Sequence, residues 1–219
     1  MIIPIPTVKR FPSYLRILNQ AKENGKEYIS ATMLAKELNL NPIQVRKDIS
    51  STGIEGKPKI GFDVDTLIAR ITHVLGWDNN TDALIVGAGN LGSAIANYGG
   101  FSNYGLRIAA VFDKDEKKIG TRIGEFAVLP IDKINQYVQE NGVRIAVITV
   151  PAGQAQAVAD LLVKCGIRGI WNFAPKDIKV PSSVVVQRTD LATSFAVLSV
   201  KLRKKTEDDV DVYIGEGEV

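Results

Sequence analysis

The stretch Asp82–Phe101, DALIVGAGNLGSAIANYGGF, decides the fold of the larger part of this chain of 219 residues. It opens with an apolar run typical of a buried strand, passes through the pattern G-x-G-x-x-G at 87–92, and enters a helix rich in small residues. Gly87 permits a tight turn, Gly89 lets the backbone approach a ligand, and Gly92 lets helix and strand pack closely. This order predicts a dinucleotide site, with the phosphates at the helix N-terminus.

The next apolar run, LRIAAVFD, ends at Asp113, about 20 residues after Gly92. A carboxylate at this place is expected to accept hydrogen bonds from the adenosine ribose hydroxyls. It also repels a 2′-phosphate and so favours NADH and NAD⁺ over their phosphorylated forms, a preference that Lys114 weakens. The residues expected to bind the cofactor are Gly87, Ala88, Gly89, Asn90, Leu91, Gly92, Asp113 and Lys114.

Strand and helix patterns alternate from the motif onward. Short continuous apolar runs are typical of parallel strands with helices on both faces. The interpretation is an α/β fold: a Rossmann domain over residues 78–189, with a doubly wound parallel sheet. An amphipathic C-terminal helix is expected over 190–206, followed by an acidic tail, 207–219, predicted to be disordered. The strand candidates are DALIVGAG, LRIAAVFD, RIAVITVP, IRGIWNF and VVVQRTD, with EFAVL as a weaker one.

Residues 1–77 have a different pattern and a different charge. Residues 1–59 hold ten Lys and Arg against five Asp and Glu, although the whole chain has a net charge of only +3. Such asymmetry indicates a basic module that meets a polyanion, although a solvated charged surface explains it equally well. Helices are predicted over 12–25, over 30–38 with Ser30 as N-cap, from Asn41-Pro42 onward, and over 63–76, with a β-hairpin at 52–64.

The second and third of these helices suit a helix-turn-helix, and the Lys-rich hairpin would then be a wing. The third helix is predicted to turn Ile43, Val45 and Ile49 inward. The alternative is an ordinary three-helix domain with a charged, solvated face. The residues expected to contact double-stranded DNA are Arg10, Ser13, Gln44, Arg46, Lys47, Ser50, Lys57 and Lys59.

Groups for catalysis and metal binding are scarce. Cys165 is the only cysteine, which excludes an internal disulfide and fits a reducing cytoplasm, and no apolar run reaches the roughly 20 residues that span a bilayer. The single imidazole, His73, lies on an apolar-patterned helix before the fingerprint. We therefore expect neither a metal site nor an enzyme. A small NAD-dependent oxidoreductase with an N-terminal dimerisation domain is the alternative. A Rossmann domain for coenzyme A ranks lower, because Asp113 would oppose a 3′-phosphoadenosine.

Seven segments from both halves match one known family: RFPSYLRIL, QVRKDIS, GKPKIGFDVDTLI, VGAGNLGSAIANYGGF, VFDKD, GIRGIWNFAP and DLATSFAVLSVKL. By these segments the chain resembles the Rex family of redox-sensing transcriptional repressors. The resemblance implies a homodimer that binds a palindromic operator and is released when NADH occupies its Rossmann domains. It also implies that the C-terminal helix is swapped between subunits.

Two positions depart from the family pattern. Many relatives have Arg where this chain has Asn90, and the resemblance implies that this Arg links the cofactor phosphates to an acid matched here by Asp190. Phe62 replaces a Tyr that many relatives have at the end of the wing. Tyr98 matches a tyrosine implicated in the switch. We expect the nicotinamide pocket around Tyr98, Val150-Pro151 and the partner's C-terminal helix, apolar enough to disfavour the cationic ring of NAD⁺.

Overall fold

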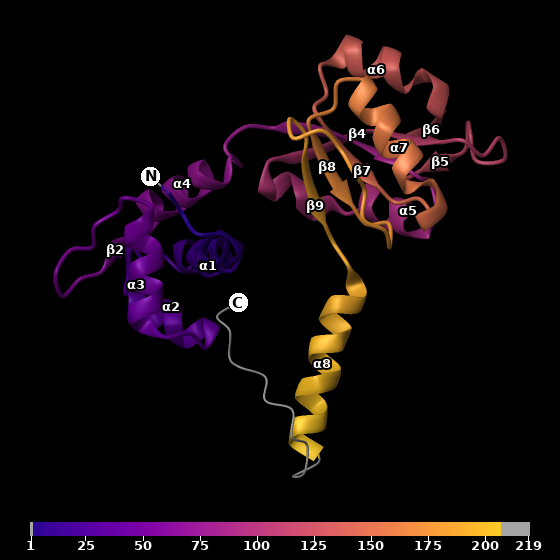
Figure 1. Ribbon diagram of the computed structural model, residues 1–219. Helices are drawn as coiled ribbons and strands as arrows, with labels where there is room; N and C mark the ends of the chain where they lie inside the picture. The colour runs from indigo at the N-terminus through magenta and orange to yellow at the C-terminus, as the bar shows by residue number, and fades with distance from the viewer. Residues whose placement is uncertain (1, 207–219) are drawn as a thin grey trace. The chain divides into compact units, whose positions relative to one another are not determined.

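The computed structural model describes residues 2–206, which form two compact units divided between Asn79 and Asn80 (Figure 1). The tail 207–219, for which disorder was predicted, lies outside the described residues.

The N-terminal unit is built from four helices and a two-stranded sheet. Each of the expected helix starts near Ser30, Asn41 and Asp63 is confirmed by a side-chain oxygen that accepts a backbone N–H: from Met33 at 3.1 Å, from Ile43 at 2.8 Å and from Thr66 at 2.8 Å. These caps satisfy N–H groups that lack an intrahelical acceptor. The elements are α1 (Ile5–Glu23), β1 (Tyr28–Ile29), α2 (Ala31–Leu38), α3 (Pro42–Ser51), β2 (Phe62–Asp63) and α4 (Val64–Leu75).

Helix α1 is longer than predicted. It starts at Ile5, after an extended Pro4, so Pro12 lies inside the helix and not at its beginning. The first turn tolerates Pro6, because a proline there removes no intrahelical hydrogen bond. The expected inward position of Ile43 is wrong: its side chain is 60% exposed, whereas Val45 and Ile49 are fully buried. Ile43 precedes Val45 by two residues, about 200° around the helix, which turns it to the opposite face.

The expected hairpin at 52–64 is present only in minimal form. Residues 56–63, here called the wing, contain one isolated bridge, between Lys57 and Gly61. Phe62–Asp63 pairs instead with Tyr28–Ile29 of β1, in antiparallel register. Gly61 has φ +114°, and a Cβ there would collide with the Ile29 carbonyl oxygen. A distant strand therefore takes the pairing that the local pattern assigned to the wing.

The second unit is a Rossmann fold, as predicted. Its sheet has the order β5-β6-β4-β3-β7-β8-β9, parallel except for β5 against β6. Apart from the added β5, this is the doubly wound order 3-2-1-4-5-6. The elements are β3 (Thr81–Val86), α5 (Asn90–Ala96), η1 (Gly99–Tyr104), β4 (Leu106–Asp113), β5 (Arg122–Ile123), β6 (Phe126–Pro130), η2 (Ile131–Lys133), α6 (Ile134–Asn141), β7 (Ile145–Ile148), α7 (Ala152–Lys164), β8 (Gly169–Asn172), β9 (Val185–Arg188) and α8 (Leu191–Thr206).

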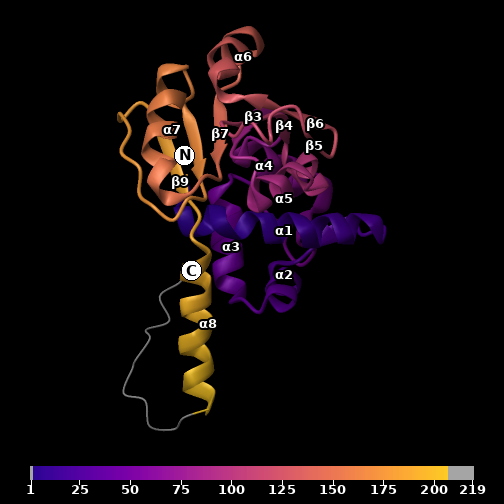
Figure 2. The same cartoon turned by 90° about the vertical axis from the view of Figure 1, so that its right-hand side faces the viewer.

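The two faces of this sheet are covered unequally. Along β3, Leu84 and Val86 pack into the core that includes residues of α6 and α7, while Ala83 and Ile85 pack with Ile95 of α5 (Figures 1 and 2). The connection from β4 to β6 contains only the short strand β5 and no helix. One helix that doubly wound sheets usually carry is therefore missing from the α5 face.

Candidate nucleotide and DNA sites

The glycine-rich loop after β3 has the geometry that the motif predicts. Gly87 has φ +112°, in the region that favours glycine, and a Cβ on Gly92 would collide with the Gly87 carbonyl oxygen. A Cβ on Gly89, by contrast, would meet no atom within 4 Å. Two glycines thus shape the turn, and the third leaves open space at the start of α5, where cofactor phosphates are expected.

Thr149, which sequence reasoning missed, holds this loop. Its hydroxyl donates to the Gly87 carbonyl oxygen at 2.8 Å and lies 3.2 Å from that of Val86. Thr149 follows β7, which pairs with β3 in parallel, so both strands end at the same edge of the sheet. The sequence feature that could have identified Thr149 is a hydroxyl-bearing residue directly after a buried apolar run.

Asp113 ends β4 beside the loop. Its carboxylate accepts from the Ala88 N–H at 2.7 Å, the Asp115 N–H at 2.9 Å and the Lys118 ammonium at 3.1 Å. Burial favours the protonated acid, but these hydrogen bonds and the charge of Lys118 outweigh it and lower the pKa of Asp113. The group is therefore an ionised acceptor at neutral pH, as recognition of ribose hydroxyls requires.

A cleft of about 440 Å³ runs between these elements. Of the residues expected to bind cofactor, it is lined by Gly87, Gly89, Leu91, Asp113, Lys114, Val150 and Pro151; it is also lined by Asp115, Lys118, Thr149, Gln154, Phe173 and Pro175, which were not expected. Tyr98 and Asp190 are not among its lining residues.

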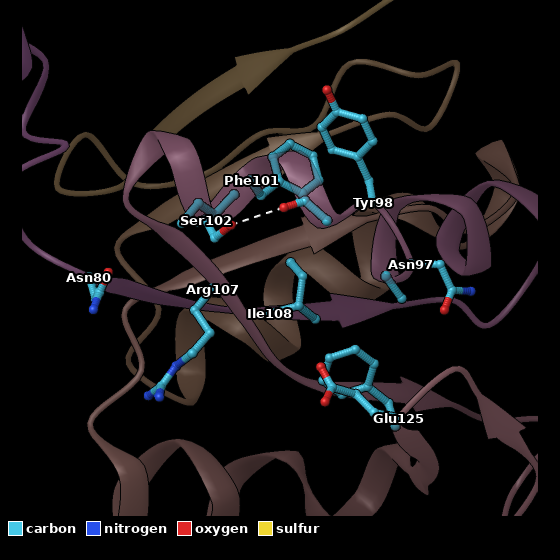
Figure 3. Close-up of a pocket in the computed structure, with 12 residues that line it drawn as sticks. Asn80, Asn97, Tyr98, Phe101, Ser102, Arg107, Ile108 and Glu125 are labelled. Atoms are coloured by element: carbon cyan, nitrogen blue, oxygen red, sulfur yellow. Dashed lines mark hydrogen bonds between the residues drawn. The ribbon is translucent and has the colours of Figure 1, made fainter. Parts of the chain in front are cut away.

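Tyr98 lines a second pocket, of about 490 Å³, on the α5 face of the sheet. Figure 3 shows the Tyr98 hydroxyl directed away from Arg107 and Glu125, with Phe101 beside the ring. The ring centroids of Tyr98 and Phe101 are 4.8 Å apart. The described residues of one chain therefore do not bring Tyr98 together with Val150, and the expected nicotinamide pocket stays a prediction.

Aromatic contacts nevertheless join the two pockets. The ring centroids of Phe101 and Trp171 are 5.9 Å apart, and those of Trp171 and Phe173 are 4.8 Å apart. Phe173 lines the nucleotide cleft. The Trp171 indole N–H also donates to Thr189 Oγ1 at 2.7 Å, two residues before α8 begins at Leu191. The sequence did not predict this series of contacts between the cleft and the C-terminal helix, because Phe101 and Trp171 come from elements far apart in the chain.

Asp190 lies at the start of α8 and has a cationic partner. Its Oδ1 accepts the Ala192 N–H at 2.9 Å, and its Oδ2 accepts from Arg188 at 2.6 Å. The same guanidinium donates to Asp177 at 2.8 Å. Asp190 is thus paired locally with Arg188, which is not among the lining residues of the nucleotide cleft.

In the N-terminal unit, a buried carboxylate lies on the inward face of helix α3. Asp48 is 1% exposed. Burial favours its protonated form, but donation by Arg10, Tyr14, Thr7 and Gln44 outweighs this effect and lowers the pKa of Asp48. The five donor–acceptor distances are 2.7 and 2.8 Å from Arg10, 2.6 Å from the Tyr14 hydroxyl, 2.9 Å from the Thr7 hydroxyl and 2.9 Å from Gln44 Nε2.

Asp48 binds two of the side chains that were expected to contact DNA, Arg10 and Gln44. The Arg10 guanidinium is engaged by Asp48 and its side chain is only 13% exposed, so it joins α1 to α3. Gln44 is half-buried, with one end of its amide on Asp48. Ser13 is half-buried on α1, while Arg46, Lys47 and Ser50 are exposed on α3 as predicted from their spacing.

The wing lies beside the exposed face of α3. Arg46, Lys57 and Lys59 line a groove of about 400 Å³ together with Ser30 and Thr32. The Lys57 ammonium donates to the Tyr28 hydroxyl at 2.7 Å, and this bond raises the pKa of Lys57. Three cationic side chains around one groove are an arrangement suited to a phosphate backbone.

Candidate catalytic groups lie away from the cleft or are buried. His73 is exposed in the N-terminal unit, with its Nδ1 2.6 Å from Asp78. Cys165 is 1% exposed, and burial raises the pKa of its thiol. Within residues 2–206, no cluster of three or more His, Cys, Asp or Glu could hold a metal ion. Over the same range, every helix is too short or too polar to cross a bilayer.

Fold and sites together define a class: a protein with a helix-turn-helix unit, a basic wing and a Rossmann unit with a nucleotide cleft. The family model described as "CoA binding domain" matches residues 78–176, and that described as "Putative DNA-binding protein N-terminus" matches residues 2–50.

Similar proteins give the family. The redox-sensing transcriptional repressors Rex of Treponema denticola and Carboxydothermus hydrogenoformans are 46% and 42% identical over 91% and 92% of this chain, and 95% and 97% of their own. The crystal structure of RSP, a Rex-family repressor, with β-NAD⁺ and operator DNA has a TM-score of 0.87 at 32% identity over 94% of this chain and 95% of RSP. RSP with β-NADH gives 0.83 over 94% and 97%. This chain belongs to the Rex family.

Proposed function

We propose that this protein is a redox-sensing repressor that binds a palindromic operator as a homodimer and leaves it when NADH binds. The observation that carries the proposal is one fold matched over 94% of the chain to a relative bound to operator DNA with NAD⁺ and to the same relative bound to NADH. Such a protein acts where the chromosome is, which in a bacterium is the cytoplasm.

The residues of the cleft fit NAD(H). The open side of Gly89 leaves room for the pyrophosphate, and the ionised Asp113 supplies an acceptor for ribose hydroxyls. NADH and NAD⁺ differ in ring charge, which supplies the signal. The apolar Val150, Pro151 and Phe173 line the same cleft and favour the uncharged ring. A ligand shifts the protein between two states only if it binds them with different affinity.

The test is a gel-shift titration on a palindromic duplex, with NAD⁺ and NADH added separately. We expect NADH to remove the shifted band at concentrations at which NAD⁺ does not. Arg46→Ala should abolish the shift, because it removes an exposed cation of the recognition helix. Its nucleotide affinity, measured by calorimetry, should be unchanged. Equal Kd values for NAD⁺ and NADH would refute the redox switch.

Coenzyme A is the second candidate ligand, because the matched family model carries its name. Asp113 opposes a phosphorylated adenosine ribose by charge, whereas Lys114 and Lys118 in the same cleft favour one. Calorimetry with coenzyme A distinguishes the two candidates. If coenzyme A binds more tightly than NADH, coenzyme A is the favoured ligand. Steady consumption of NADH with a small carbonyl compound would instead support an oxidoreductase.

Dimer formation through α8 is supported by an exposed apolar face of this helix and by a pocket with both apolar and polar lining residues. Helix α8 exposes Phe195, Leu198 and Leu202 at helical spacing, between 59% and 69% each. The pocket of Figure 3 lies on the α5 face, where the β4–β6 connection has no helix, and is lined by Phe101, Leu106 and Phe126 among others. We propose that α8 packs there on the partner subunit. Leu198→Asp should convert the dimer to a monomer in light scattering, with Lys201→Ala as the control on the same helix.

A further inference from the structure

Gln44 is the third residue of α3, in the part of a recognition helix that meets base edges. A glutamine amide can present either its carbonyl oxygen or its NH₂ group, and the two read opposite base patterns. The question is therefore which end of this side chain faces the DNA.

The contact with Asp48 answers this question. Gln44 Nε2 lies 2.9 Å from Asp48 Oδ1, and an ionised carboxylate only accepts hydrogen bonds. If the amide turned over, two oxygens would face each other with no proton between them. One N–H of the Gln44 amide is therefore bound to Asp48, and its Oε1 and second N–H are left for a partner outside the helix.

Asp48 is itself fixed from α1. Arg10 donates to both of its oxygens, and the Thr7 and Tyr14 hydroxyls add one hydrogen bond each. Since the carboxylate is 1% exposed, water does not compete for these bonds. The orientation of Gln44 is thus set by the packing of α1 against α3 before any DNA arrives.

We propose that Asp48 orients Gln44 so that its carbonyl oxygen reads an exocyclic amino group in the major groove, N6 of adenine or N4 of cytosine. Only these two bases offer a hydrogen-bond donor there. Adenine suits the arrangement further, because the second N–H of the amide can reach its N7. Asp48 is then a positioning residue for base recognition, and the inference rests on the proposed operator binding.

The experiment first selects the tightest duplex from a random DNA library with the full-length protein. Each adenine of one half-site is then replaced by purine, and each cytosine by 2-pyrimidinone, which delete only the amino group. We expect one position at which the deletion weakens binding of the unmodified protein about tenfold. For Gln44→Ala the same deletion should have no further effect, because the two changes remove one contact.

Lys47→Ala is the matched control on the same helix. It should weaken binding to all duplexes alike and keep the amino-group dependence, because a phosphate contact carries no base information. Asp48→Asn tests the positioning. An asparagine NH₂ group can donate to Gln44 Oε1, so the amide can turn over, and the amino-group dependence should fall although NADH still binds.

The outcomes separate cleanly. If every amino-group deletion weakens Gln44→Ala as much as the unmodified protein, the base reading is wrong. If a folded Asp48→Asn keeps the full dependence, the positioning is wrong, and if that variant does not fold, the Gln44 cycle still decides the base reading. If selection recovers no duplex at all, the proposed function fails, not this inference.

Discussion

Two buried aspartates, one in each unit, differ in what surrounds them. Asp48 accepts five hydrogen bonds, all from side chains of α1 and α3. Asp113 accepts two from backbone N–H groups and one from the half-exposed Lys118, and it lines an open cleft. A carboxylate enclosed by side chains joins two helices, whereas one held by the backbone at the edge of a cleft can still take a ligand.

The largest expected effect follows from removing the enclosed carboxylate. Asp48→Ala removes the carboxylate that accepts two hydrogen bonds from the largely buried Arg10, which should cost about 3–5 kcal/mol of unfolding free energy. Urea denaturation followed by Trp77 fluorescence in a Trp171→Phe background reports on the N-terminal unit, whose core Trp77 contacts. Lys22→Ala, which breaks the exposed Lys22–Asp65 pair, is the control and should cost at most about 1 kcal/mol. A similar loss in both variants would mean that the buried Asp48 contributes no more to stability than an exposed ion pair.

The pH dependence of the unfolding free energy should report the ionisation of Asp48. The folded pKa of Asp48 lies below the unfolded value of about 3.9. Its contribution is therefore fully present above that unfolded value and is lost as pH falls through the folded pKa. The stability difference between the unmodified protein and Asp48→Asn, measured by urea denaturation between about pH 6 and 3, should shrink toward acid. A constant difference would show that ionisation of Asp48 does not matter.

The cleft aspartate should affect binding more than stability. Asp113→Asn replaces an ionised acceptor by a neutral amide, and we expect the Kd for NADH to rise about tenfold. Asp82→Asn, at the other end of the Rossmann sheet, is the control, since Asp82 pairs with Arg107 outside the cleft. Calorimetry measures both. An unchanged Kd for NADH in Asp113→Asn would mean that Asp113 does not bind the cofactor and, like Asp48, has only a structural role.

The smallest effect is expected for Lys118→Ala. Its ammonium is 3.1 Å from Asp113 and its side chain is 40% exposed, so water can replace it. The Kd for NADH should change by less than about threefold. The same calorimetric titration with NADPH should show weaker binding than in the unmodified protein, because a cation of the cleft is gone. A large loss of NADH affinity would mean that Lys118 holds the cofactor directly.

Local signals predicted much of this molecule. The caps at Ser30, Asn41 and Asp63 need only neighbouring residues, and so does the glycine loop after β3. The hairpin prediction failed because a distant segment competes: β1 takes the pairing of Phe62–Asp63. The prediction for Ile43 failed for a local reason, because a residue two positions from Val45 lies on the opposite face of the helix.

The sequence by itself determined the Rossmann fold, the main helices and strands and the glycine loop, because periodicity, caps and glycines act over a few residues. Only the tertiary structure decided which side chains share a site. It brought Thr149 to the loop, Phe173 to the cleft and Arg10 to Asp48, over separations that no local pattern spans. Buried polar groups must find partners wherever the fold places them, and those partners become visible only when the chain is packed.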